Sequence, residues 1–205
     1  MKRDFSLYVL VTGSLASAPL EDCIRQVIKG GADAIQLREK DLCDRDLLAL
    51  ARRVREIIPR ERAMFVVNDR PDIARLAGAD GVHLGQDDLT IEAARCVLGA
   101  EAVIGRSTHS IKQAEEALAQ GADYIAIGPV FPTATKGYDE GIGIELAGRI
   151  SAISQAPVVA IGGMKPQRVP ELRAAGIKRI AVCSAVISQK DIRASAAAFR
   201  SALSI

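Results

Sequence analysis

The stretch AQGADYIAIGPVF, residues 119–131, joins the end of an expected helix to the start of an expected buried strand. Its first part, AQGAD, places a glycine where a segment of helical period stops, and glycine suits the left-handed residue that ends many helices. Its second part, YIAIGPVF, is a run of residues that favour strands. The same Gly-Ala-Asp junction recurs at 31–33 and 78–80, and a related AAGIK stands at 174–178. This spacing predicts repeated strand–helix units.

Strand-like runs alternate with longer helical segments along the whole chain. In DLLALARRVREII, residues 46–58, apolar residues recur every three or four positions and predict one buried helix face. Eight runs are expected to be strands: 7–13, 34–39, 63–69, 81–85, 103–108, 124–131, 157–163 and 179–186. Eight such units predict a single (β/α)8 TIM barrel over residues 1–205, without a linker or second domain, and an open doubly wound sheet is the alternative.

The composition is that of an ordinary globular protein. Hydrophobic residues make up 49%, charged residues make up 25%, and 27 basic residues nearly balance 25 acidic ones. No Lys/Arg block alternates with aromatic residues, so neither nucleic acid nor a membrane surface is expected as a partner, and any anion must be held locally. The four cysteines lack the spacing of a zinc site or a disulfide framework, which fits a reducing cytoplasm.

The start of the chain, MKRDFSLYVLVTGSLASA, shares features with a secretory signal. Asp4 interrupts it, however, and the apolar run LYVLV has only five residues, fewer than the usual ~7–15. LYVLV is therefore expected to form the first strand. Because no apolar stretch approaches the ~20 residues that span a bilayer, a cytoplasmic protein is predicted.

Charged residues stand at the end of the second expected strand, in QLREK, residues 36–40. Alternation places Gln36, Arg38 and Lys40 on one side, with Ile35 and Leu37 on the other side, facing the helices. In (β/α)8 barrels the chemistry lies at the C-terminal ends of the strands. Cations aimed into the barrel mouth predict an anionic ligand, because their desolvation must be offset; a salt bridge to a neighbouring acidic residue at a solvated rim is the alternative.

Acidic residues follow the third and fourth expected strands. VVNDR and GQDD bring Asn68 and Asp69 near Asp87 and Asp88. Mg²⁺ is commonly held by one or two carboxylates, with water and substrate phosphate oxygens as its other ligands. Asn-Asp alone is also a common turn or helix cap. Acidic pairs on two neighbouring strand ends, beside the cations of strand two, favour a site for a metal diphosphate.

Strands five, seven and eight also end in residues suited to binding. Strand five closes in GRSTHS, where Ser107 could contact a ligand and His109 could either transfer a proton or flank a helix cap. His83 is expected to be a buried structural residue. The glycines at 162–163, with Ser184 on the adjacent strand, would form a phosphate cup, although glycines also serve tight turns.

The loop GPVFPTATKG, residues 128–137, places two hydroxyls and an ammonium directly after the sixth expected strand. Thr133, Thr135 and Lys136 would lie between the diphosphate site of strands two to four and the phosphate cup of strands seven and eight. A polar surface turn explains the polarity of this loop but not its place among the other strand ends. The loop is therefore predicted to contact two ligands.

Seven motifs resemble the thiamine-phosphate synthase family in order and spacing: QLREK, NDR, GVHLGQDD, GRSTHS, GPVFPTATKG, AIGG and VCSAV. The resemblance covers nearly the whole chain and implies a (β/α)8 transferase of thiamine biosynthesis with Mg²⁺ as its cofactor. It would join 4-amino-2-methyl-5-(diphosphooxymethyl)pyrimidine to the nitrogen of 4-methyl-5-(2-phosphooxyethyl)thiazole and release diphosphate. The implied mechanism is dissociative, so it needs charge stabilisation and positioning rather than a side-chain nucleophile.

The resemblance also assigns residues by motif. The pyrimidine diphosphate would be bound by Gln36, Leu37, Arg38, Glu39, Lys40, Asn68, Ser107 and Lys136. Four of these would be catalytic: Arg38, Lys40, Ser107 and Lys136. Mg²⁺ would be held by Asp69 and Asp88. The thiazole phosphate would be bound by Thr133, Ala134, Thr135, Gly163, Cys183 and Ser184. The family usually carries Val in place of Cys183 and often an apolar residue in place of Arg106, whose direction stays open.

Two other functions remain as alternatives. The thiazole tautomerase branch of the same superfamily, an isomerase, uses a histidine near the end of strand five, which His109 could match, but it has no use for a diphosphate clamp. A non-catalytic barrel that senses a phosphorylated ligand would not need the full metal and diphosphate set. The expected partners are small-molecule substrates, and the sequence leaves open whether the chain forms a homo-oligomer.

Overall fold

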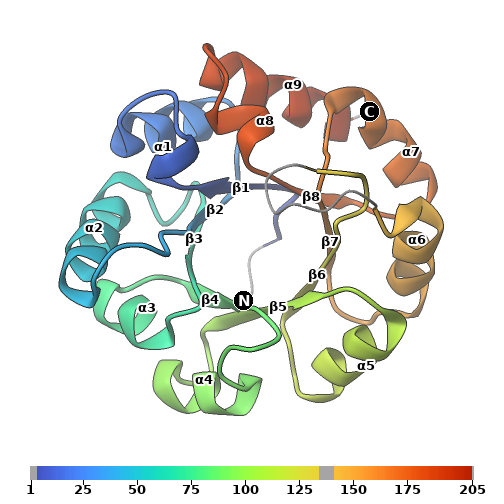
Figure 1. Cartoon of the computed structure of the whole chain (residues 1–205), viewed down its shortest axis with the longest axis horizontal. Helices are drawn as coiled ribbons and strands as arrows, with labels where there is room; N and C mark the ends of the chain where they lie inside the picture. Colours follow the sequence, from blue (N-terminus) through green and yellow to red (C-terminus); the bar gives the residue numbers. More distant parts are fainter. Residues whose placement is uncertain (1–3, 134–140, 205) are drawn as a thin grey trace.

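Eight parallel strands close into a barrel in the computed structural model, which describes residues 4–133 and 141–204. Each strand pairs with the next one along the chain, and β8 pairs with β1, as the ring in Figure 1 shows. The strands are β1 (Leu7–Val11), β2 (Ala34–Leu37), β3 (Met64–Asn68), β4 (Gly81–Leu84), β5 (Val103–Thr108), β6 (Tyr124–Ile127), β7 (Val158–Ile161) and β8 (Arg179–Val182). The predicted (β/α)8 barrel is confirmed, and the open doubly wound sheet is wrong.

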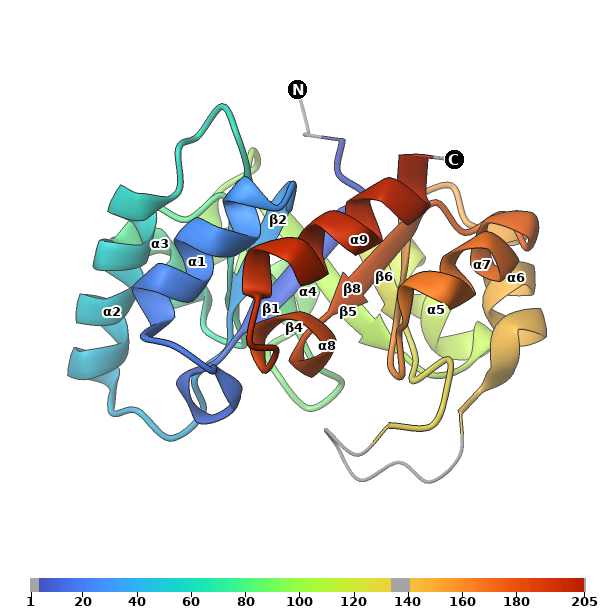
Figure 2. The ribbon, with the colours of Figure 1, turned by 90° about the horizontal axis from the view of Figure 1, so that it is seen from above.

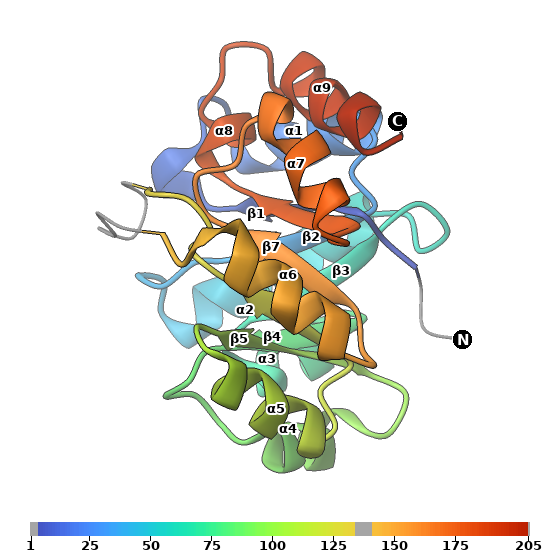
Figure 3. The ribbon, with the colours of Figure 1, turned by 90° about the vertical axis from the view of Figure 1, so that its right-hand side faces the viewer.

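Helices surround this barrel, and Figure 3 shows α5, α6 and α7 lying over the outer side of the strands. The main helices are α1 (Leu20–Lys29), α2 (Asp44–Ile57), α3 (Pro71–Ala77), α4 (Ile91–Leu98), α5 (Ile111–Ala119), α6 (Gly143–Ile153), α7 (Val169–Ala174) and α9 (Ile192–Ser204). Short helical turns are η1 (Gly13–Leu15), η3 (Pro166–Arg168) and α8 (Ser184–Ile187). The apolar face predicted for α2 is confirmed, because Leu47, Leu50, Ala51 and Val54 are buried.

Within residues 4–133 and 141–204, none of the helices has the length and apolar character needed to cross a membrane.

Most strands end earlier than the runs of β-forming residues suggested. The run at 179–186 was expected to be one strand, but β8 stops at Val182 and the next residues form α8. The N–H groups of Val186 and Ile187 donate to the carbonyl of Cys183, which closes a helical turn instead of extending the sheet. A short apolar run fits a buried helical turn as well as a strand, so the pattern could not distinguish them.

Alternation along the strands produces two cores. One set of strand residues packs outward against the helices. The other set fills the barrel: Phe5, Tyr8, Leu10, Ala34, Met64, Val66, Tyr124, Ala126, Val159 and Ala181. Phe5, Tyr8 and Tyr124 meet edge to face, with ring centroids 5.5–6.0 Å apart. A side chain at Gly105 would lie 2.0 Å from the Tyr124 ring, so glycine is needed there.

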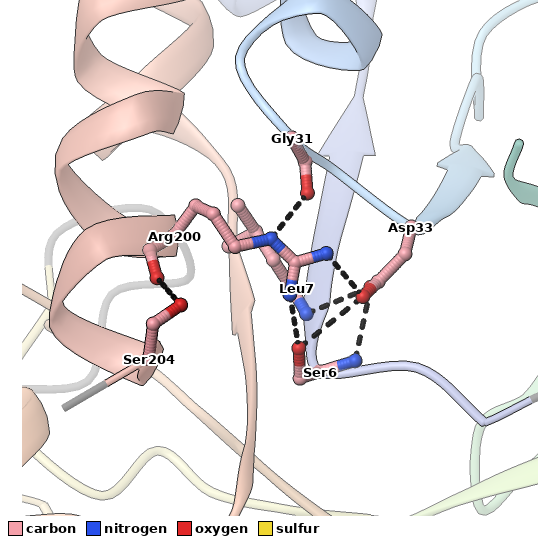
Figure 4. Close-up of polar contacts among 6 residues, drawn as sticks. All are labelled: Ser6, Leu7, Gly31, Asp33, Arg200 and Ser204. Carbon is pink, nitrogen blue, oxygen red and sulfur yellow. Dashed lines mark hydrogen bonds and ion pairs between the residues drawn. The ribbon is translucent and has the colours of Figure 1, made fainter.

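The aspartate of each Gly-Ala-Asp junction binds the strand before it. Figure 4 shows this at Asp33, whose carboxylate accepts from the N–H of Ser6 at 2.9 Å and of Leu7 at 2.8 Å. The same carboxylate pairs with Arg200 of α9 at 2.6 Å. Arg200 also donates to the carbonyl of Gly31, so the last helix is attached to the first two strands.

The other two junctions repeat this arrangement. Asp80 accepts from Phe65 N at 2.7 Å and pairs with Arg55 of α2 at 3.0 Å. Asp123 accepts from Ile104 N at 2.8 Å and pairs with Arg95 of α4 at 2.8 Å. The weak repeat in the sequence therefore has a structural role, because each aspartate joins two neighbouring strands and a helix at the N-terminal end of the barrel.

Asp123→Ala should lower the free energy of unfolding by about 3 kcal/mol, because it leaves Arg95 and the Ile104 N–H without this acceptor in a partly buried place. The Asp123 side chain is only 4% exposed. Urea unfolding measures the change. Glu116→Ala is the control: its side chain is 54% exposed and lies 3.8 Å from Lys112, so about 0.5 kcal/mol or less is expected. Equal losses in both variants would contradict the role given to Asp123.

Candidate active site at the C-terminal ends of the strands

A cavity of about 310 Å³ opens at the C-terminal ends of the strands and is lined by residues from all eight of them. In Figure 2 this is the end that carries α8, opposite the first and last described residues. The lining includes eleven of the residues predicted for the site: Gln36, Arg38, Lys40, Asn68, Asp69, Asp88, Ser107, Thr133, Gly163, Cys183 and Ser184. Ala134, Thr135 and Lys136 lie outside the described residues.

The motif QLREK, residues 36–40, contributes only some of its side chains to the cavity: Gln36, Arg38 and Lys40 line it. Gln36 is 2% exposed and faces inward, as alternation predicted. Lys40 Nζ lies 3.2 Å from Asp69 Oδ2, so the cation is paired with an acidic residue of the next strand end. Leu37 packs in the outer core, and Glu39 accepts a hydrogen bond from Gly13 N at 2.5 Å. The side chains of Leu37 and Glu39 therefore support the site from outside the cavity.

Two carboxylates, Asp69 and Asp88, meet beside these cations. Burial and hydrogen bonding with Asp88 raise the pKa of Asp69 above its ordinary value, while Lys40 has the opposite effect. Asp88 Oδ2 also accepts from Gly85 N at 2.5 Å, which holds its loop in place. Asp69 is the non-glycine residue with a positive φ, 62°, in the described chain, a strained conformation of the kind often found at functional sites.

This pair of carboxylates could hold a divalent cation, which would offset the cost of placing them together. The described residues contain no group of three or more His, Cys, Asp or Glu side chains arranged for a metal. A hard cation here would therefore need water or ligand oxygens to complete its coordination, which is how Mg²⁺ commonly binds. Asp87 and Asp88 both line the cavity, but Asp87 is exposed, whereas Asp88 is partly buried and contacts Asp69.

Arg106, whose direction the sequence left open, points away from the cavity and holds the loop that carries Asp88. Its guanidinium donates to the carbonyls of Gln86 and Leu89, each at 3.0 Å. Gln86 in turn donates to the carbonyl of Ser107 on the same strand as Arg106. The β4–α4 loop is thus attached to β5 at several points.

Replacing Arg106 with Met should loosen this loop without emptying the space that the side chain occupies. We expect amide hydrogen exchange at Gly85 and Asp88 to become about tenfold faster, because two hydrogen bonds to the loop are lost. Exchange measured residue by residue by NMR tests this. Arg52→Met on the exposed side of α2 is the control and should leave these amides unchanged. Unaltered exchange in Arg106→Met would show that other contacts hold the loop.

The opposite side of the cavity is formed by the loops after β7 and β8. Gly163, Cys183 and Ser184 line it, and α8 begins at Ser184. Gly162 and Gly163 have φ values of 101° and 60°, and side chains there would come within 2.7 Å of residues 129–132. The two glycines therefore let the β7 loop pack directly on the segment that follows β6.

Both histidines take the positions expected of them but also line the cavity. His83 is 7% exposed, and its Nε2 lies 2.9 Å from Ser107 Oγ. His109 precedes Ser110, the N-cap of α5, and its ring contacts the carbonyl of Gly128. Tyr8, which the sequence motifs did not indicate, lines the cavity floor. Alternation along β1 could have indicated it, because Tyr8 and Leu10 share the inward face.

A charged cavity at the C-terminal ends of the strands is where enzymes of this fold have their active sites. Residues 7–186 match the family model described as thiamine monophosphate synthase. The thiamine-phosphate synthase of Ruminiclostridium cellulolyticum is 41% identical over 196 residues, 95% of this chain and 93% of that one. The thiamine-phosphate synthase of Moorella thermoacetica is 42% identical over 199 residues, 96% of this chain and 94% of that one.

Solved structures agree with this assignment. The thiamine phosphate pyrophosphorylase from Pyrococcus furiosus superimposes with a TM-score of 0.90 and 36% identity, over 98% of this chain and 96% of that one. A 3-hexulose-6-phosphate synthase, with a TM-score of 0.70 and 19% identity, shares the fold alone. The chain belongs to the thiamine monophosphate synthase family, and it is an enzyme, a transferase.

Proposed function

We propose that this transferase joins 4-amino-2-methyl-5-(diphosphooxymethyl)pyrimidine to the nitrogen of 4-methyl-5-(2-phosphooxyethyl)thiazole, with Mg²⁺ as cofactor, releasing diphosphate and forming thiamine phosphate. One observation carries the proposal: Arg38 and Lys40 line the same cavity as the paired carboxylates of Asp69 and Asp88. Cations and a carboxylate pair at one place suit a diphosphate bound together with a divalent metal. The names of the family and of the relatives support the same reaction.

The residues around the pyrimidine diphosphate would stabilise the charge of the leaving group. Asp69 and Asp88 would hold Mg²⁺, which would supply positive charge to offset the negative charge of the departing diphosphate. Arg38 and Lys40 add positive charge from β2, and Lys136 is predicted to add more from the loop after β6. A dissociative reaction needs these functions and no side-chain nucleophile.

The thiazole phosphate would bind on the other side of the cavity. Gly163 and Ser184 lie at the loops after β7 and β8, and a short helix follows β8, which is the usual phosphate site of (β/α)8 barrels. Thr133 lines the cavity beside them, and Ala134 and Thr135 are predicted to contribute as well. Two anion sites on one cavity suit a reaction between a diphosphate and a phosphate.

An isomerase acting on a thiazole phosphate is less well supported. Such an isomerase would use His109 and would give no role to the carboxylates of Asp69 and Asp88 or to the cations Arg38 and Lys40. A ligand sensor would likewise need no strained Asp69.

The proposed reaction predicts that purified protein, given both substrates and Mg²⁺, forms thiamine phosphate and diphosphate in equal amounts. Chromatography follows the first product, and a coupled diphosphate assay follows the second. Chelation of the metal should stop both. Absence of product with both substrates would refute the synthase, conversion of a thiazole carboxylate tautomer alone would support the isomerase, and binding without turnover would support the sensor.

Asp88→Asn should lower kcat/KM by about 100-fold or more, because it removes one charge from the metal pair. The asparagine side-chain oxygen can still accept from Gly85 N, so the loop keeps its shape. Glu92→Gln, in the first turn of α4 after the same loop, is the control, and its exposed position outside the cavity lining predicts less than about a threefold change. Steady-state kinetics at several Mg²⁺ concentrations compare them. A near-normal Asp88→Asn enzyme at saturating Mg²⁺ would show that the metal assignment is wrong.

A further inference from the structure

Five side chains form a continuous hydrogen-bonded chain across the floor of the cavity. Gln36 Nε2 donates to Tyr8 Oη at 2.8 Å, and Tyr8 Oη lies 3.0 Å from Tyr124 Oη. Tyr124 Oη lies 3.0 Å from His83 Nδ1, and His83 Nε2 lies 2.9 Å from Ser107 Oγ. The chain therefore joins β2 to β5 through β1, β6 and β4. Its two ends, Gln36 and Ser107, are residues proposed to bind the pyrimidine.

The protons of this chain have one order when the Gln36 amide nitrogen faces Tyr8. Tyr8 accepts from Gln36, which leaves its single proton available to be donated to Tyr124. Tyr124 then donates to His83 Nδ1, and the single imidazole proton sits on Nε2 and is donated to Ser107. In this order each of the four contacts has one donor and one acceptor, and the Ser107 proton is left for a ligand.

The opposite order would require all five groups to change together. Ser107 would donate to His83, His83 to Tyr124, Tyr124 to Tyr8, and the Gln36 amide would turn to offer its oxygen. The first order is favoured because a phenol is a stronger proton donor than an aliphatic hydroxyl, which is the better acceptor. Burial raises the pKa of Tyr8 and of Tyr124 above the ordinary tyrosine value, so both hydroxyls keep their protons.

We propose that this chain couples the two ends, so that the site presents the Gln36 amide oxygen as an acceptor together with the Ser107 hydroxyl as a donor. Tyr8, Tyr124 and His83 are then positioning residues that select an aminopyrimidine. The 4-amino group supplies a donor and the ring nitrogen an acceptor, which match this pair. The inference rests on the proposed function, because it concerns the pyrimidine of that reaction.

A 4-oxopyrimidine has the opposite pattern, with an acceptor oxygen next to a ring N–H donor. To bind it equally well, the whole chain would have to reverse. Removing one link separates the two ends, so that each can turn by itself to suit either ligand. The chain thus predicts that Tyr124, which is not part of the cavity lining, influences the discrimination without touching the ligand.

The experiment measures dissociation constants by calorimetry, without the thiazole phosphate, for the 4-amino and 4-oxo forms of 2-methyl-5-(diphosphooxymethyl)pyrimidine. The wild type should prefer the amino form by about 100-fold or more. Tyr124→Phe, which keeps the ring that packs on Phe5, should reduce this preference about tenfold. Tyr8→Phe should reduce it as well. The double variant should resemble Tyr124→Phe, because a chain already broken loses nothing further.

Phe5→Leu is the control, since it alters the same aromatic cluster without removing a polar group, and it should leave the preference unchanged. Thermal melting checks each variant, and Tyr8→Phe carries the test if Tyr124→Phe does not fold. An unchanged preference in the folded tyrosine variants, or additive losses in the double variant, would overturn the inference. If the wild type bound neither pyrimidine and formed no thiamine phosphate, the proposed function would be refuted as well. If the wild type formed thiamine phosphate but the variants kept its preference, only the coupling would be refuted.

Discussion

The barrel depends on three carboxylates that bind backbone N–H groups at the N-terminal ends of the strands. Asp33, Asp80 and Asp123 each join two neighbouring strands to an arginine of an outer helix. These contacts complete the hydrogen bonding of strand ends that would otherwise lack acceptors. These three carboxylates lie at the end of the barrel opposite the cavity, whereas the C-terminal ends of the strands carry the charged residues of the site.

The aromatic residues inside the barrel fill its lumen and also provide polar groups beneath the cavity. Phe5, Tyr8 and Tyr124 fill the lumen with aromatic rings, and the cavity lies beyond them at the C-terminal ends of the strands. The hydroxyls of the two tyrosines lie on the cavity side of this packing and join Gln36 to His83. Gly105 makes the arrangement sterically feasible, because any side chain there would overlap Tyr124. One packed layer therefore closes the barrel and provides the polar floor of the site.

Much of the site followed from the order of strand ends, because side chains at the C-terminal ends of barrel strands must converge. Asp69 and Asp88 meet, as Lys40 and Asp69 do, although they stand far apart in sequence. The motif QLREK assigned Leu37 and Glu39 to the site together with Gln36, Arg38 and Lys40, because a motif names residues but not the direction of each side chain. The order of strand ends also did not indicate Tyr8 and Tyr124, whose contact crosses the barrel between strands that are not adjacent.

The sequence alone determined the periodic features of this protein: the number and order of strands, the glycines between helix and strand, and the inward face of β2. These follow from local geometry, which repeats every two residues in a strand and every 3.6 in a helix. Only the tertiary structure decided that Arg106 holds the Asp88 loop, that β8 gives way to α8, and that five polar groups form one chain. Those features depend on distances between elements remote in sequence, and such distances are set when the sheet closes.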